Sequence, residues 1–244
     1  MSRDRYRCTF DSVAETYERS RPLYAEIAVD WIAERLPFGR VLDLGAGTGK
    51  LTRQLVARGA DVVAVEPGDE MRAVLERQVP GAVAPAGAAE AIPLPDGDVD
   101  TVVVAQAFHW FRTEEALAEM HRVLRPGGGF ALVWNEWDEE DTLMHAINDL
   151  VESLRPDLPH RDGLPDWWLE LEGSPLFGEL EERRFRHAER LDADRLVERM
   201  RSVSAYIAAE PDERARVEAE ARALVGEGEV EFPSVTSVVV ADRV

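Results

Sequence analysis

Short apolar segments alternate with helical segments between residues 40 and 135, and this alternation constrains the fold more than any other feature of the chain. Arg40–Leu44, Asp61–Glu66 and Val99–Ala105 are short and largely apolar, as buried strands are. A further strand is expected at Phe130–Trp134, and segments with helical periodicity separate these strands. The alternation predicts an α/β fold, in which a mostly parallel, Rossmann-like sheet has helices on both faces.

The rest of the chain gives weaker signals. A third strand is expected at Ala82–Ala86, marked by little except alanine and valine, and later strands are expected near Arg183–Glu189 and at Thr236–Ala241. Residues 138–180 are acidic, contain several prolines and tryptophans, and lack the strand–helix alternation. We interpret this segment as a helical cap inserted over the substrate side of the fold.

The composition limits the class of partner. The formal net charge is -20 over 244 residues, of which 45% are hydrophobic and 31% charged, as is ordinary for a globular protein. A surface with this much negative charge repels phosphate backbones and anionic lipids. We therefore expect neither nucleic acid nor a membrane as a partner. The single cysteine, Cys8, excludes an intramolecular disulfide and a cysteine zinc cluster, and no metal is expected. No apolar signal segment or long apolar run is visible, so we expect a cytoplasmic protein. The oligomeric state stays open.

A glycine-rich turn follows the first strand. Residues 41–49 read VLDLGAGTG, so the chain passes from a strand through a tight turn into a helix whose first N–H groups lack partners. A Walker A loop would need glycine in place of Leu44 and serine or threonine in place of Leu51. A dinucleotide-binding turn would need a small residue in place of Lys50, which disfavours that alternative. The pattern that remains is D-x-G-x-G-x-G, beginning at Asp43.

This turn resembles motif I of the class I S-adenosylmethionine-dependent methyltransferases. The chain is similar to their small-molecule (type 11) branch, including trans-aconitate-type methyltransferases. Residues 106–111 (QAFHWF) and 119–128 (EMHRVLRPGG) carry the same resemblance, which covers residues 41–134. It implies a seven-stranded sheet with an antiparallel last strand, S-adenosylmethionine as the cofactor and a small-molecule methyl acceptor. The expected single domain then consists of N-terminal helices with the cofactor-binding core (1–137), the cap (138–180) and the completion of the sheet (181–244).

Ligands of open α/β sheets bind beyond the carboxyl ends of the strands, which locates the expected cofactor site. Glu66 ends the second strand, where a carboxylate accepts both ribose hydroxyls. The resemblance places Asp43 near the methionine end of the cofactor and Met71 against the adenine. It also places Tyr17 and Arg21 over the cofactor. The full set of expected cofactor-binding residues is Tyr17, Arg21, Asp43, Gly45, Ala46, Gly47, Glu66, Pro67, Met71, Ala89, Glu90 and Gln106.

His109 and Trp110 follow the strand at Val99–Ala105 and are expected to line the substrate pocket. For a hydroxyl or nitrogen acceptor, His109 is the candidate catalytic base. A carboxylate acceptor needs no base, and Arg21 is a candidate to orient it. The alternative for His109 is a structural, hydrogen-bonded imidazole. Two other functions stay open: an NAD(P)-dependent oxidoreductase, which Lys50 disfavours, and a non-catalytic protein that binds S-adenosylmethionine.

Overall fold

The structure is a computed structural model and describes residues 13–138, 140–154 and 166–244. Packing divides it into two compact units. The first unit holds the described residues of Met1–Pro22, Glu136–Asp162 and Arg186–Val235. The second unit holds those of Leu23–Asn135, Gly163–Phe185 and Thr236–Val244. The predicted single domain, with its core (1–137), cap (138–180) and completion of the sheet (181–244), stays a prediction.

The chain order of the elements is α2 (Ala14–Ser20), α3 (Glu26–Arg35), β1 (Arg40–Leu44), α4 (Lys50–Ala57), β2 (Asp61–Val65), α5 (Asp69–Gln78), β3 (Val99–Ala105), the short 3-10 helix η1 (Phe108–Trp110), α6 (Thr113–Val123), β4 (Leu124–Trp137), α7 (Thr142–Glu152), α8 (Asp166–Glu172), β5 (Glu181–Leu191), α9 (Ala193–Met200), α10 (Ser204–Ala208), α11 (Pro211–Val225) and β6 (Val230–Asp242).

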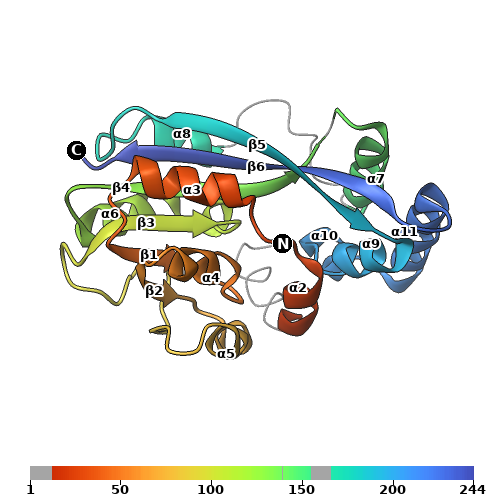
Figure 1. Cartoon of the computed structure of the whole chain (residues 1–244), viewed down its shortest axis with the longest axis horizontal. Helices are drawn as coiled ribbons and strands as arrows, with labels where there is room; N and C mark the ends of the chain where they lie inside the picture. The colour runs from red at the N-terminus through yellow and green to blue at the C-terminus, as the bar shows by residue number, and fades with distance from the viewer. Residues whose placement is uncertain (1–12, 139, 155–165) are drawn as a thin grey trace. The chain divides into compact units, whose positions relative to one another are not determined.

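The strands form one sheet in the order β2-β1-β3-β4-β6-β5, and β1 pairs in parallel with both β2 and β3, as β3 does with β4 (Figure 1). Two hydrogen bonds show that β6 runs antiparallel to β4. Thr236 Oγ1 donates to Asn135 Oδ1 at 2.6 Å, and Arg243 N donates to Gly128 O at 2.8 Å, so the two strands are traversed in opposite directions. The predicted parallel core with an antiparallel last strand is therefore confirmed.

The prediction of seven strands is wrong, because the described sheet has six. Ala82–Ala86 contributes only an isolated parallel bridge between Val63 and Val83. The physical reason lies in the segment's own residues. Val83 is 60% exposed, and Pro85 has no N–H to donate to a neighbouring strand. Beyond the bridge, the segment is joined to the end of β2 by one long hydrogen bond, from Glu66 N to Pro85 O at 3.4 Å.

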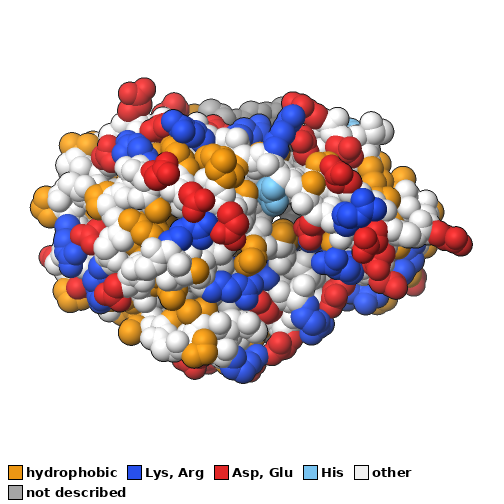
Figure 2. Space-filling view, viewed as in Figure 1, with side chains coloured by type: hydrophobic (Ala, Val, Ile, Leu, Met, Phe, Trp, Pro, Cys, Tyr) orange, Lys and Arg blue, Asp and Glu red, His pale blue; other side chains and the backbone are white. Residues whose placement is uncertain are grey.

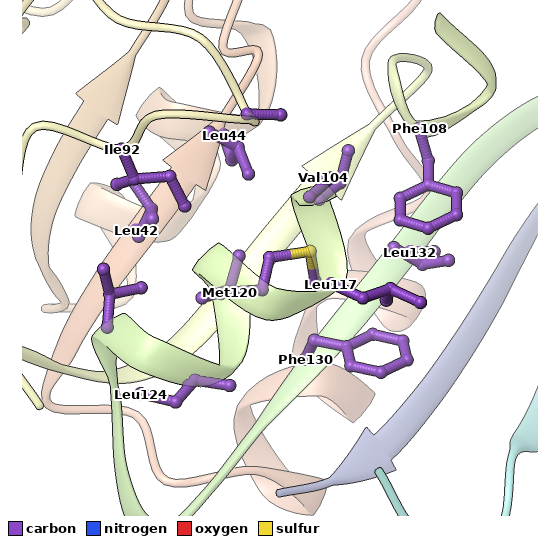
Figure 3. Packing of buried hydrophobic residues seen from close by; sticks show 14 of the residues in the cluster. Leu42, Leu44, Ile92, Val104, Phe108, Leu117, Met120, Leu124, Phe130 and Leu132 are labelled. Atoms are coloured by element: carbon purple, nitrogen blue, oxygen red, sulfur yellow. The ribbon is translucent and has the colours of Figure 1, made fainter. Parts of the chain in front are cut away.

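Both faces of the sheet are buried, as predicted. Along β1, Leu42 belongs to one hydrophobic cluster and Val41 to another, because successive side chains point to opposite faces. Helix α6 covers the first face, where Met120 and Leu117 pack with Leu42, Phe130 and residues of β3 (Figure 3). Helices α3 and α4 cover the second face.

The first unit has its own apolar core, built mainly from α7, α9, α11 and β6. Met144, Ile147, Val217 and Phe232 are all fully buried in it. Helices α7 and α8 lie within the predicted cap at 138–180, and their position over a substrate stays a prediction. Figure 2 shows acidic and basic side chains interspersed over the visible face, so the acidic excess is not gathered into one patch there.

Candidate functional site

Backbone geometry shapes the turn after β1. Gly45, Gly47 and Gly49 have φ values of 73°, 56° and 82°, in the left-handed region that glycine adopts without strain. A Cβ on Gly45 would lie 2.8 Å from the Cβ of Ala107, whereas a Cβ on Gly47 would meet nothing within 4 Å. Gly45 N donates to Val65 O at 2.8 Å, which ties the turn to β2. The space beside Gly47 is thus open to an approaching ligand.

Glu66 follows β2 directly, and two backbone N–H groups fix its carboxylate. Gly47 N donates to Oε2 at 2.9 Å, and Gly68 N donates to Oε1 at 2.8 Å. The side chain therefore joins the glycine turn to the residue before α5. Each carboxylate oxygen has more than one lone pair, so such an anchored carboxylate is suited to accept from a pair of hydroxyls as well.

Asp43 lies in β1 and is completely buried. Thr52 Oγ1 of α4 donates to Asp43 Oδ2 at 2.6 Å, whereas Oδ1 has no hydrogen-bond partner among the described residues. Burial raises the pKa of Asp43 from 3.8 to about 7; the bond from Thr52 opposes this shift and the charge of Glu66 adds to it. A buried carboxyl oxygen without a partner favours a ligand that brings an N–H group or a positive charge.

Gln106 lies at the carboxyl end of β3 and has a φ of 57°. Among the described residues other than glycine, it alone has a positive φ. Its backbone N donates to Val133 O at 2.9 Å, and its Nε2 donates to Asn135 O at 2.8 Å. Strained backbone of this kind is concentrated at functional sites. The structure thus places Gln106 at the predicted edge of the sheet, held against β4.

Asn135 is the centre of a hydrogen-bond network that the sequence did not suggest. Its Nδ2 donates to Leu23 O at 3.0 Å, and its Oδ1 accepts from Thr236 Oγ1 at 2.6 Å. Thr236 Oγ1 in turn accepts from Ala25 N at 3.0 Å. Together with Gln106, this network joins β3, β4, β6 and the segment before α3.

The aromatic residues after β3 form the helix η1. Phe108 is fully buried, while His109 and Trp110 are half-buried, with ring centroids 4.7 Å apart. Trp110 N donates to Ala107 O at 2.9 Å, which closes the turn. His109 and Trp110 thus lie beyond the carboxyl end of β3, in the same unit as the glycine turn, as the sequence predicts.

The other predicted contacts of the second unit occupy the loops around these residues. Ala89 is buried, and Glu90 Oε1 accepts from Arg112 N at 3.0 Å just before α6. Met71 is buried on α5, whereas Pro67 is exposed. Ala46 N donates to Val65 O at 3.2 Å, so Ala46 belongs to the glycine turn. Their contacts with a cofactor stay predictions.

Tyr17 and Arg21 belong to the first unit. The guanidinium of Arg21 lies 5.5 Å from the centroid of the Tyr17 ring. Its Nε donates to Ser202 Oγ at 2.8 Å, so Arg21 is held by the turn after α9. Their predicted place over the cofactor stays a prediction.

The comparisons with known proteins decide the family. A profile described as a methyltransferase domain matches residues 42–132, which contain the glycine turn, Glu66 and η1. An uncharacterized methyltransferase-like protein of Schizosaccharomyces pombe is 36% identical over 217 residues, 87% of this chain and 84% of that protein. The chain belongs to the class I S-adenosylmethionine-dependent methyltransferases.

Other members of this family cover the chain to different extents. An uncharacterized methyltransferase of Mycobacterium tuberculosis is 51% identical over 145 residues, which is 59% of this chain and 58% of that protein. The match thus spans little more than half of that relative's length. A solved structure assigned as a type II methyltransferase, from Anaeromyxobacter dehalogenans, is 29% identical and has a TM-score of 0.66, covering 91% of this chain and 97% of that one. The similarity to trans-aconitate-type methyltransferases stays a prediction.

Sequence reasoning missed the residues that support this site. Thr52 is the third residue of α4, and its sequence position does not show that it faces the buried Asp43. Asn135 and Thr236 are far apart in the chain, so no local pattern connects them.

In the part of the chain that the structure describes, no helix is both long and apolar enough to cross a membrane.

Proposed function

We propose that this chain is an enzyme that transfers the methyl group of S-adenosylmethionine to a small-molecule acceptor. The observation that carries the proposal is the arrangement at the carboxyl ends of β1 and β2. There an open glycine turn, the anchored carboxylate of Glu66 and the orphan oxygen of Asp43 lie together in a member of this methyltransferase family. The predicted cytoplasmic location, and the exclusion of nucleic acid and membrane as partners, stay proposals.

The residues fit the cofactor in three respects. Gly47 N and Gly68 N hold the carboxylate of Glu66 in place, where it would accept hydrogen bonds from the ribose hydroxyls. Asp43 would hold the methionine end, because its unpartnered Oδ1 can accept from the cationic amino group. The absence of a side chain at Gly47 lets the ligand approach the backbone.

When bound, S-adenosylmethionine supplies a methyl carbon on a positively charged sulfur; an acceptor lone pair forms the new bond to that carbon as the electrons of the carbon–sulfur bond return to sulfur. The protein contributes alignment and the exclusion of water. We assign His109 as the base that removes the acceptor proton when a hydroxyl or nitrogen is methylated, because it lies at the carboxyl end of β3. Replacing His109 with glutamine is expected to lower kcat without changing cofactor affinity; unchanged kcat would remove this role.

The cofactor assignment is tested by paired variants at Glu66 and Glu70. Glu70 is exposed on α5, four residues beyond Glu66, so E70Q makes the same chemical change outside the proposed site. We expect E66Q to weaken S-adenosylmethionine binding about 10- to 100-fold, because a hydrogen bond to a charged group contributes roughly 1.5–3 kcal/mol. E70Q should bind as the wild type does. Equal dissociation constants for E66Q and the wild type would refute the assignment.

A further inference from the structure

Four aromatic side chains of the second unit pack against one another, and we call them the indole cluster: Phe108, Trp134, Trp167 and Trp168. The rings of Trp134 and Trp167 are stacked, with centroids 5.3 Å apart and planes 24° from parallel. The rings of Phe108 and Trp167 pack edge to face, with centroids 5.6 Å apart. The rings of Trp168 and Trp167 also pack edge to face, with centroids 5.8 Å apart. Trp167 is therefore the common contact of the other three rings.

The cluster adjoins the edge of the sheet where the cofactor site lies. Trp134 is in β4, directly after the residue whose carbonyl accepts from Gln106 N. Phe108 begins η1 and contacts Phe111 at 5.8 Å between ring centroids. Phe111 in turn lies 3.4 Å from the position that a Cβ on Gly45 would occupy. A continuous line of contacts thus leads from the glycine turn through Phe111 and Phe108 to Trp167.

Trp167 also has an unusual polar atom. Its indole Nε1 is shielded from solvent and has no hydrogen-bond partner among the described residues. Buried indole N–H groups usually have an acceptor, and leaving one unpaired costs stability. In the described part of the second unit, only Asp43 shares this property, through its Oδ1. The unpartnered acceptor, Asp43 Oδ1, is on β1 just before the glycine turn, and the unpartnered donor, Trp167 Nε1, is on α8. The line of contacts described above runs between these two elements.

We propose that the indole cluster recognises the methyl acceptor, and that this acceptor is a flat aromatic molecule with a carbonyl oxygen that accepts a hydrogen bond from Trp167 Nε1. This inference rests on the proposed function and assigns its substrate class. An aromatic ring takes the place of Trp134 or Trp168, the half-buried rings now packed on Trp167, so ring stacking is exchanged and the N–H gains the partner it lacks.

The chain offers a direct probe, because it has six tryptophans and the indole N–H of each gives its own signal in a nitrogen-15 NMR spectrum. The full chain is titrated with acetophenone, with S-adenosylhomocysteine present and absent. Ethylbenzene, which lacks the oxygen, and cyclohexyl methyl ketone, which lacks the aromatic ring, are the matched ligands. The variant W167F identifies the Trp167 signal and retains an aromatic ring. The control is W31F, because Trp31 packs with Phe185 in the cluster on the opposite face of the sheet.

We expect acetophenone to move the Trp167 proton signal downfield and to bind more tightly than either matched ligand. W167F should lose about fivefold in acetophenone affinity, the value of one neutral hydrogen bond, and nothing in ethylbenzene affinity, while W31F binds acetophenone as the wild type does. A Trp167 signal that acetophenone leaves unmoved, or equal acetophenone affinity in W167F and the wild type, would overturn the inference. Failure of S-adenosylhomocysteine to bind would instead contradict the proposed function. The two failures can be told apart, because the acetophenone titration without S-adenosylhomocysteine still reports on the cluster.

Discussion

Replacing Asp43 with asparagine isolates the effect of one buried carboxyl group on stability. The asparagine is close to the same size and its Oδ1 still accepts from Thr52 Oγ1, but it cannot ionise. Burial raises the pKa of Asp43 to about 7 in the folded protein, from 3.8 for the ordinary group. Between these two values the folded state keeps the proton that the unfolded state releases.

The sign follows from that difference. A folded-state pKa above the unfolded value makes stability greatest at low pH, and stability is lost as the pH rises toward the folded pKa. Each pH unit within this interval costs about 1.4 kcal/mol, so Asp43 removes roughly 2–3 kcal/mol of unfolding free energy between pH 5 and pH 8. Between pH 5 and pH 8, the unfolding free energy of the wild type therefore falls by this amount relative to that of D43N. Any effect of the asparagine that does not depend on pH leaves this change unaltered.

The assay is urea-induced unfolding of both proteins at pH 5, 6, 7 and 8, followed by circular dichroism. The quantity of interest is how the difference in unfolding free energy between D43N and the wild type changes with pH. Asp212 is exposed on α11, so D212N removes the same charge from the surface and serves as the control. Parallel stability profiles for the wild type and D43N would refute the argument that burial raises the pKa of Asp43.

Three further substitutions test the geometry of the site. G45A forces a Cβ to 2.8 Å from that of Ala107 at a φ of 73°, so it should lower the unfolding free energy by about 2–4 kcal/mol in a denaturant titration. G47A has open space around its Cβ and should cost only about 1 kcal/mol by the same measurement, yet abolish S-adenosylmethionine binding in calorimetry; retained binding would contradict the proposed approach of the ligand. T236V removes the hydroxyl shared by Asn135 and Ala25 and should cost about 1–3 kcal/mol, measured by urea unfolding, since the buried Ala25 N and the half-buried Asn135 Oδ1 lose their partner.

The sequence predicted the parts of the fold that depend on local pattern. The limits of β1 and β3 match their expected residues, because a short apolar run identifies each of them without reference to the rest of the chain. Ala82–Ala86 was expected as a strand and forms only a bridge, because alanine and proline give little apolar surface to bury. Helices α7 and α8 lie in the segment interpreted as a helical cap, for which no helix limits were predicted because it lacks the strand–helix alternation.

The candidate site was predictable to the same extent. The glycine turn, Glu66 and the residues of η1 follow strands directly, so the rule that ligands bind at the carboxyl ends of strands located them. The orphan oxygen of Asp43 and the orphan N–H of Trp167 were not predictable, because each depends on what surrounds the atom in three dimensions. A sequence shows which groups are polar, and only the packed structure shows which of them lack a partner.

The most direct test of the central claim is titration calorimetry of the wild-type chain with S-adenosylmethionine, S-adenosylhomocysteine and NADPH. Binding of the first two at micromolar concentration, without binding of NADPH, is the result that the glycine turn, Glu66 and Asp43 predict. Binding of NADPH alone would contradict the claim and identify the turn as a dinucleotide site, despite the lysine at position 50.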